Sequence, residues 1–197
     1  GGIAGIINNN GSEAERGELL QMLSVQAHRG PDGSGVAFAD RKRVGFGHVR
    51  LSIIDLTTGA QPLWSADEKV VITFNGEIYD HLDHMKQLEA DGFPFRTRSD
   101  TEVIVNIYRR HGLDFLSHLN GEFSFALWDE TKRFFIAARD RYGVKPFFYR
   151  QTNEEILFSS EAKGLLALPR VPRDFSTDHI MTSLISAPLQ AVSPFKG

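Results

Sequence analysis

Residues 122–138 constrain the fold more than any other part of this sequence, because they hold two strand patterns on either side of a short turn. In the first pattern Phe123, Phe125 and Leu127 alternate with smaller or polar residues, and a second apolar run covers residues 134–138. Alternation of this kind is typical of a strand with one face on a core. The segment therefore predicts an antiparallel hairpin.

Three other segments also have strand patterns. Residues 70–74 are dominated by β-branched side chains and interrupted only by Thr73, which suits a strand covered on both faces. Residues 44–54 and 156–160 are further strand candidates beside turn-rich segments.

One helix is predicted towards each end of the chain. Ser12 and Glu15 have the spacing of a capping box and open a helix that runs to Ala27. Ser176 is placed to cap a short helix that extends to Leu184.

Two more helices are predicted in the middle of the chain. The first follows Asp80 and stops at Gly92, and the second begins with a capping box of Ser99 and Glu102 and ends at Gly112. The residues expected to face inward are Leu82, Met85 and Leu88 in the first and Val103, Ile104, Ile107 and Tyr108 in the second. Two antiparallel sheets with helices on their outer faces satisfy this order of elements, so the predicted fold class is α+β.

The length of 197 residues, 41% of them hydrophobic, suits one compact domain. After residue 168 the pattern loosens and prolines recur. We therefore expect a domain over residues 1–168, with residues 169–197 as its C-terminal edge or a linker.

The composition of the chain excludes several classes of function. The formal net charge of −3 comes from 22 basic and 25 acidic residues mixed along the chain, so a nucleic-acid partner is not expected. No stretch approaches the roughly 20 apolar residues needed to cross a bilayer, and the chain is expected to be cytoplasmic, with no membrane partner. There is no cysteine, which excludes disulfides and any thiol nucleophile.

Motifs for phosphate, dinucleotide and metal binding are absent from the sequence. It contains neither a Gly-x-x-x-x-Gly-Lys-Ser/Thr loop nor a complete dinucleotide fingerprint, and its seven histidines form no His-Glu-x-x-His arrangement. Neither a metal site nor a cofactor is predicted for this domain.

Several polar clusters remain, each with a simple structural interpretation. Asn75 and Gly76 could form a turn after a strand, and Ser99 with Asp100 could be only a helix cap. Arg50 could be a surface charge or a member of a buried ion pair. None of these clusters decides the function by itself.

The order of the clusters along the chain carries more information. It resembles the class II glutamine amidotransferase domain of asparagine synthetase, over nearly the whole chain. The matching motifs are Gly2-Ile3-Ala4-Gly5, His28-Arg29-Gly30-Pro31-Asp32, Arg50-Leu51-Ser52-Ile53-Ile54-Asp55, Gly59-Ala60-Gln61-Pro62, Asn75-Gly76-Glu77-Ile78-Tyr79, Ser99-Asp100-Thr101-Glu102, Arg139-Asp140-Arg141-Tyr142-Gly143-Val144-Lys145-Pro146 and Ser160-Glu161-Ala162-Lys163-Gly164. The resemblance implies a four-layer αββα sandwich of the N-terminal-nucleophile (Ntn) hydrolase type.

The resemblance also implies site residues. Position 1 is a cysteine in that family, whose thiolate attacks the side-chain amide of glutamine while the terminal amine moves the proton. Asn75 and Gly76 match the oxyanion hole. Arg50 matches the clamp for the substrate carboxylate, and Glu77 and Asp100 match the acceptors for its ammonium group.

This chain departs from the family at Gly1, which has no side chain. We expect it to bind glutamine without hydrolysing it. The glycine could be an engineered change or a tag remnant, or it could be a natural loss. Natural loss would make the chain a non-catalytic scaffold, as in the similar β-lactam synthetases.

The resemblance implies partners as well. L-Glutamine is the expected ligand, and ammonia would pass to a synthetase domain of the same polypeptide, for which residues 169–197 would be the linker. That domain would hold ATP and Mg²⁺, because this chain lacks a Ser-Gly-Gly-x-Asp-Ser loop. A homodimer is possible by family resemblance.

Overall fold

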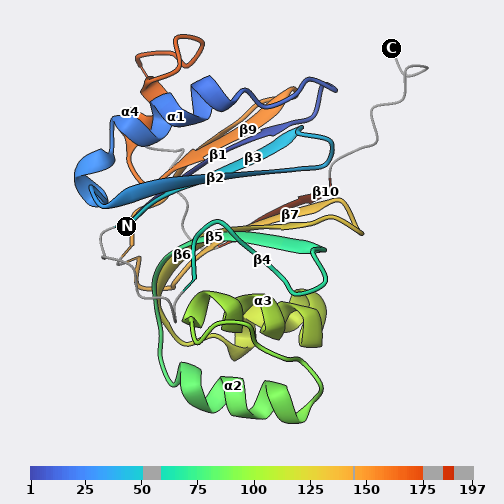
Figure 1. The fold of residues 1–197 in the computed structure, drawn as a ribbon. Coiled ribbons are helices and arrows are strands. Elements are labelled where there is room, and N and C mark those ends of the chain that lie inside the picture. The colour runs from blue at the N-terminus through green and yellow to red at the C-terminus, as the bar shows by residue number, and fades with distance from the viewer. Residues whose placement is uncertain (51–58, 144, 175–183, 189–197) are drawn as a thin grey trace.

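The structure is a computed structural model that describes residues 1–50, 59–143 and 145–174 and the backbone of 184–188. Two five-stranded antiparallel sheets are stacked face to face, with helices on their outer sides (Figure 1). The predicted α+β sandwich of two antiparallel sheets is confirmed.

The first sheet has the strand order β2-β3-β1-β9-β8, and α1 and α4 lie on its outer face. Its strands are β1 (Gly2–Asn8), β2 (Gly33–Ala39), β3 (Val44–Arg50), β8 (Phe148–Gln151) and β9 (Glu155–Ser159). Its helices are α1 (Arg16–Ser24) and α4 (Ala162–Leu166), and a short 3-10 helix, η1 (Ala27–Arg29), follows α1.

The second sheet has the strand order β10-β7-β6-β5-β4, and α3 covers its outer face with α2 beyond it (Figure 1). Its strands are β4 (Leu63–Trp64), β5 (Val70–Ile78), β6 (Gly121–Asp129), β7 (Phe134–Arg139) and β10 (Leu184–Pro188). Its helices are α2 (His81–Ala90), α3 (Asp100–His111) and the 3-10 helix η2 (Gly112–His118).

The strand predictions are largely confirmed. The hairpin over residues 122–138 is β6 and β7, and the strands predicted at 70–74 and 156–160 are β5 and β9. The strand predicted at 44–54 is β3 as far as Arg50, and residues 51–54 lie outside the described residues.

Aromatic rings fill the space between the two sheets. The ring of Phe46 on β3 contacts that of Phe158 on β9 edge-on, with 5.5 Å between ring centroids, and Phe135 on β7 stacks on Phe158 at 6.0 Å. Because strand residues alternate between faces, Phe46, His48 and Arg50 all point towards the second sheet. A Cβ on the intervening Gly47 would lie 2.7 Å from a methyl carbon of Leu23, so this opposite face packs closely on α1.

The helix near the N-terminus begins later than predicted. It starts at Arg16, and Glu15 at its N-cap makes no side-chain capping hydrogen bond. The Ser12 amide donates to Oδ1 of Asn10 at 2.9 Å, so Ser12 belongs to the preceding turn. The predicted capping box was wrong because this local side-chain contact forms in place of a helical turn.

The inward face of α2 was partly mispredicted. Met85 and Leu88 are buried, but Leu82 is 51% exposed. A spacing of three residues rotates each side chain about 60° away from the previous one, so Leu82 and Leu88 lie about 120° apart on the helix. The helix ends at Ala90, and Gly92 follows two residues later with a positive φ of 94°, as expected of a glycine that stops a helix.

Helix α3 has the predicted cap, but not the complete capping box. Ser99 accepts a hydrogen bond from the Thr101 amide at 3.0 Å. The carboxylate of Glu102 accepts from Arg96 and Thr97 in the loop before the helix instead of reaching the Ser99 amide. The four predicted core residues of this helix are buried, and Gly112 follows its end with a φ of 66°.

The segment after residue 168 contributes a strand. The backbone of Leu184 pairs with Ala138 at the edge of the second sheet, so the predicted helix does not extend to Leu184. An edge strand forms there because β7 offers unpaired backbone groups on that side. Residues 176–183 lie outside the described residues, and the domain boundary at 168 stays a prediction.

Candidate active site

The candidate site lies where β1 begins and β3 and β5 end. Gly1 precedes β1, whose residues Ile3 and Ile7 belong to the core between the sheets. Alternation therefore directs a side chain at position 1 towards the second sheet. A Cβ added to Gly1 would lie 3.4 Å from Oδ1 of Asn75 and 3.4 Å from Nε2 of His48. These are ordinary contact distances, so a side chain at position 1 fits without moving its neighbours.

Asn75, whose Oδ1 lies nearest to this point, also carries an unused hydrogen-bond donor. Its side chain is 7% exposed, and its Nδ2 has no hydrogen-bond partner among the described residues. Buried amide donors are nearly always paired, so an unpaired one marks a place where a ligand or water is expected. Asn75 and Gly76 lie within β5, so the alternative prediction of a simple turn was wrong.

Gly76 follows with backbone geometry that only glycine tolerates. Its φ is 142°, and a Cβ there would lie 2.0 Å from the carbonyl oxygen of Glu122. The neighbouring amides on the same edge of β5 have partners: Phe74 N–H donates to Oε1 of Gln61, and Ile78 N–H donates to Oδ2 of Asp100. The alternation of ladder bonds places the Gly76 N–H on that same edge, between them.

Arg50 ends β3 two residues after His48 and on the same face. The segment from the end of η1 to the start of β2 contains Gly30 and Gly33 and packs directly against Arg50. A Cβ on Gly30 would lie 2.5 Å from the Arg50 amide nitrogen, and one on Gly33 would lie 2.9 Å from Nε of Arg50. Nε of Arg50 is buried and has no hydrogen-bond partner among the described residues. A half-buried guanidinium with an unused donor is suited to an incoming carboxylate.

Asp100 connects the start of α3 to the end of β5. Its Oδ2 accepts the hydrogen bond from the Ile78 amide at 3.0 Å. Burial raises the pKa of Asp100, and the negative charge of Glu77 adds to this rise, while the Ile78 amide and His81 act in the opposite direction. Glu77 is exposed and directly precedes Ile78.

Two residues that the sequence interpretation did not assign also contact position 1. Nε of Arg29 donates to the Gly1 carbonyl at 3.0 Å. Burial lowers the pKa of the Gly1 amine, and the positive charges of Arg29 and Lys145 lower it further. The second residue is His48. The sequence could have indicated it, because His48 is a polar residue two positions after Phe46 and therefore on the same inward face of β3.

The structure thus brings Gly1, Asn75 and His48 together and ties Asp100 to the end of β5. The substrate-binding roles of Arg50, Glu77 and Asp100, and the oxyanion roles of Asn75 and Gly76, stay predictions.

In the described ranges there is no group of three or more His, Cys, Asp or Glu residues that could hold a metal ion. Within those same ranges, no helix has the length and apolar character needed to span a membrane.

Comparison with known proteins gives a consistent result. Residues 1–195 match the family model described as a glutamine amidotransferase domain. "Amidase chry2" of Gibberella zeae is 46% identical over 156 residues, which cover 79% of this chain and 23% of the relative. "Asparagine synthetase [glutamine-hydrolyzing] 1" of Bacillus subtilis is 42% identical over 168 residues, which cover 84% and 26%. The chain spans about a quarter of the length of these relatives.

A solved structure supports the fold assignment. The glutamine phosphoribosylpyrophosphate amidotransferase from Bacillus subtilis superposes with a TM-score of 0.73 at 20% identity, covering 96% of this chain and 49% of that one. At this identity the likeness concerns the fold alone, and the fold is the Ntn-type sandwich predicted from the motifs. The family match over residues 1–195 identifies the chain as a member of the class II glutamine amidotransferase domain family.

Proposed function

We propose that this domain binds L-glutamine where β1 begins and β3 and β5 end, and that its role is to release ammonia from the glutamine side chain for a synthetase domain. The observation that carries the proposal is that the side-chain amide of buried Asn75 lies beside the Cβ position of residue 1 and that its Nδ2 has no hydrogen-bond partner among the described residues. The amide end of glutamine would lie between these two groups.

The charged end of glutamine would be held by the surrounding residues. The guanidinium of Arg50 would pair with the α-carboxylate through parallel hydrogen bonds, and Glu77 and Asp100 would accept from the ammonium group. The opposite charges of the site then match the two ends of the zwitterion. This orientation directs the carboxamide towards position 1.

With a cysteine at position 1, the thiolate would attack the carboxamide carbon and form a tetrahedral intermediate. The negative charge that develops on the amide oxygen would be stabilised by Nδ2 of Asn75 and the N–H of Gly76. The terminal amine, whose pKa is lowered by burial, would take up the thiol proton and pass it to the leaving ammonia. Water would then release glutamate from the thioester.

Gly1 removes the nucleophile and leaves the rest of this arrangement in place. We therefore propose that the chain binds glutamine without turning it over. The acceptor of ammonia would be bound by a synthetase domain, which would also hold ATP and Mg²⁺. Glutamine-hydrolysing synthetases among the relatives, of which this chain covers only about a quarter, support this division of roles.

The test uses two variants of position 1. Calorimetric titration of the Gly1 chain with L-glutamine should show one binding site, with no ammonia released. Gly1→Cys, with the cysteine exposed as the terminal residue, should raise glutaminase activity by at least about 10³-fold, since removing a catalytic nucleophile costs up to about 10⁶-fold in comparable enzymes. Gly1→Ala is the matched control, because it fills the Cβ position without supplying a thiol.

Two results would contradict the proposal. One is the absence of glutamine binding to the Gly1 chain at millimolar concentration. The other is a correctly processed Gly1→Cys chain that binds glutamine and stays inert.

A further inference from the structure

His48 is a buried histidine that the proposed reaction does not use. It lies on β3 between Phe46 and Arg50 on the inward face, and its side chain is one of the nearest neighbours of position 1. Only 8% of the residue is exposed. A histidine at this depth, in contact with the reacting position, needs a physical explanation.

The surroundings of His48 keep its ring neutral. Burial lowers the pKa of His48 to about 4, and the positive charges of the Gly1 amine and Arg50 act in the same direction. A hydrogen bond with the backbone of Phe74 opposes them only in part. His48 therefore carries no charge at neutral pH.

The interaction with Phe74 also determines whether His48 can donate or accept a further hydrogen bond. A neutral imidazole has one N–H donor and one nitrogen with a lone pair. The interaction with the Phe74 backbone raises the pKa of His48, which is the direction expected when a ring N–H donates to a carbonyl, and this arrangement leaves the other nitrogen as an acceptor. Phe74 directly precedes Asn75, so the same segment of β5 fixes the ring and carries the unpartnered donor.

The donor and the acceptor together match a carboxamide. We propose that His48 is a specificity-determining residue that accepts a hydrogen bond from the –NH₂ of the glutamine side chain, opposite the Asn75 donor that binds its oxygen. This inference rests on the proposed function, because it concerns the amide end of the same pocket. Arg50, Glu77 and Asp100 contact groups that glutamine and glutamate share, so the distinction between the two must be made near position 1.

Glutamate would bind less tightly than glutamine, because its side chain lacks the N–H donor. Its γ-carboxylate has no N–H for the lone pair of His48, and two acceptors would face each other in a buried place. Sites built to bind a substrate N–H reject analogues that lack it, because a buried polar group is then left unpaired. For one such contact we expect about a tenfold preference, equivalent to about 1.4 kcal/mol.

The experiment is a double-mutant cycle between the protein and the ligand, measured by calorimetry on the Gly1 chain at pH 7.5. The two ligands are L-glutamine and the γ-methyl ester of L-glutamate, which is neutral and similar in shape but has no –NH₂. The two proteins are the unmodified chain and His48→Phe. The unmodified chain should bind glutamine about tenfold more tightly than the ester, and His48→Phe should bind both within twofold of each other.

His48→Gln is the rescue variant, because its side-chain carbonyl restores an acceptor in the pocket. It should recover part of the preference for glutamine. If His48→Phe does not fold, the comparison of His48→Gln with His48→Met, a side chain of similar length without a strong acceptor, gives the same cycle.

The outcomes separate this inference from the proposed function. Equal binding of glutamine and ester by the unmodified chain overturns the role of His48 and leaves glutamine binding intact. A His48 variant that loses both ligands equally, with the ratio unchanged, also overturns it and assigns the ring a purely structural role. If the unmodified chain binds neither ligand, the proposed function falls, and the inference about His48 falls with it.

Discussion

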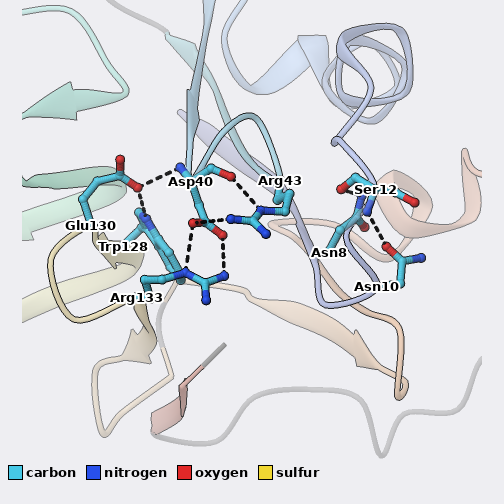
Figure 2. A network of polar contacts seen from close by, with 8 residues as sticks. All are labelled: Asn8, Asn10, Ser12, Asp40, Arg43, Trp128, Glu130 and Arg133. Atoms are coloured by element: carbon cyan, nitrogen blue, oxygen red, sulfur yellow. Dashed lines mark hydrogen bonds and ion pairs between the residues drawn. The ribbon is translucent and has the colours of Figure 1, made fainter. Parts of the chain in front are cut away.

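The two ends of the sandwich differ in how fully their buried polar groups are paired. At the end formed by the β2–β3 and β6–β7 hairpins, Asp40 accepts from Nε and Nη2 of Arg133 at 3.0 and 2.8 Å and from Arg43 at 3.0 Å (Figure 2). Oε1 of Glu130 accepts from the Asp40 amide at 2.7 Å and from the indole N–H of Trp128 at 2.6 Å. We call this the hairpin clamp, because it joins a hairpin of one sheet to a hairpin of the other.

At the opposite end, where the candidate site lies, several buried polar atoms have no hydrogen-bond partner among the described residues. They include Nδ2 of Asn75, Nε of Arg50 and Oγ of Ser124, which lies opposite Asn75 in the β5–β6 register. Both ends are built from the same strands, so the contrast is not one of fold. Satisfied groups stabilise the closed end, and unsatisfied groups at the other end are available to a ligand.

The largest expected effect on stability is at the hairpin clamp. Arg133→Ala should lower the free energy of unfolding by about 3 kcal/mol, because it leaves the buried carboxylate of Asp40 with only part of its compensation. Urea denaturation measures the change. Arg110→Ala is the matched control: Arg110 is about half exposed and pairs with Asp91 at 3.6 Å, so its loss should cost less than about 1 kcal/mol.

Equal losses for Arg133→Ala and Arg110→Ala would show that the clamp contributes no more than a surface ion pair. Glutamine binding should stay unchanged in both variants, since neither arginine is at the candidate site. A loss of glutamine binding in a folded Arg133→Ala chain would show that the hairpin clamp and the candidate site are not independent.

A smaller effect is expected from the titration of His48. The unfolded chain has a histidine pKa of about 6.5, whereas the folded value is about 4. Between these values the unfolded state binds more protons, so the free energy of unfolding should fall as the pH drops from 6.5 towards 4. Between pH 7 and pH 5 this amounts to about 2 kcal/mol.

Urea midpoints at pH 7 and pH 5 test this for the unmodified chain and for His48→Gln. The other titrating groups are common to both chains, so the difference between their pH dependences isolates His48. Identical pH dependences would mean that His48 is not held neutral, and the acceptor role would lose its basis.

The smallest effects come from two fully buried hydroxyls. Oγ1 of Thr73 donates to the Gly47 carbonyl at 2.9 Å, whereas Oγ of Ser124 has no partner among the described residues. Thr73→Val should therefore cost about 1 kcal/mol, and Ser124→Ala should be neutral or stabilising by up to about 1 kcal/mol. Calorimetric unfolding of the two variants measures this. If Ser124→Ala costs as much as Thr73→Val, Ser124 has a partner and the contrast between the ends is weaker.

Much of the fold was predictable because it depends on local patterns. The alternation of Phe123, Phe125 and Leu127 gave the central hairpin, and Gly112 marked the end of a helix. Boundaries were less predictable. Glu102 has the spacing of a capping box, but donors in the preceding loop take its carboxylate, and such competition depends on how a loop folds back.

The site was predictable in part, and by a different route. Asn75, Gly76 and Arg50 were assigned from the order of motifs along the chain, since nothing in their local pattern indicates a common site; of the three, the structure places Asn75 beside position 1. The contact between His48 and position 1 depends on the register in which β3 pairs with β1, which a sequence pattern does not contain. The hairpin clamp was missed for the same reason, because Asp40 and Arg133 are 93 positions apart.

The place of β1 in its sheet has a consequence for how the chain folds. This first strand is flanked by β3 and β9, and the Ile3 amide donates to Ser160 Oγ, 157 positions later. This strand comes before the other described strands in the chain, and it must wait for nearly all of them before its sheet can close. Contacts of such sequence separation slow folding and leave strand edges exposed in the meantime. Position 1 can thus reach its place beside Asn75 only late in assembly.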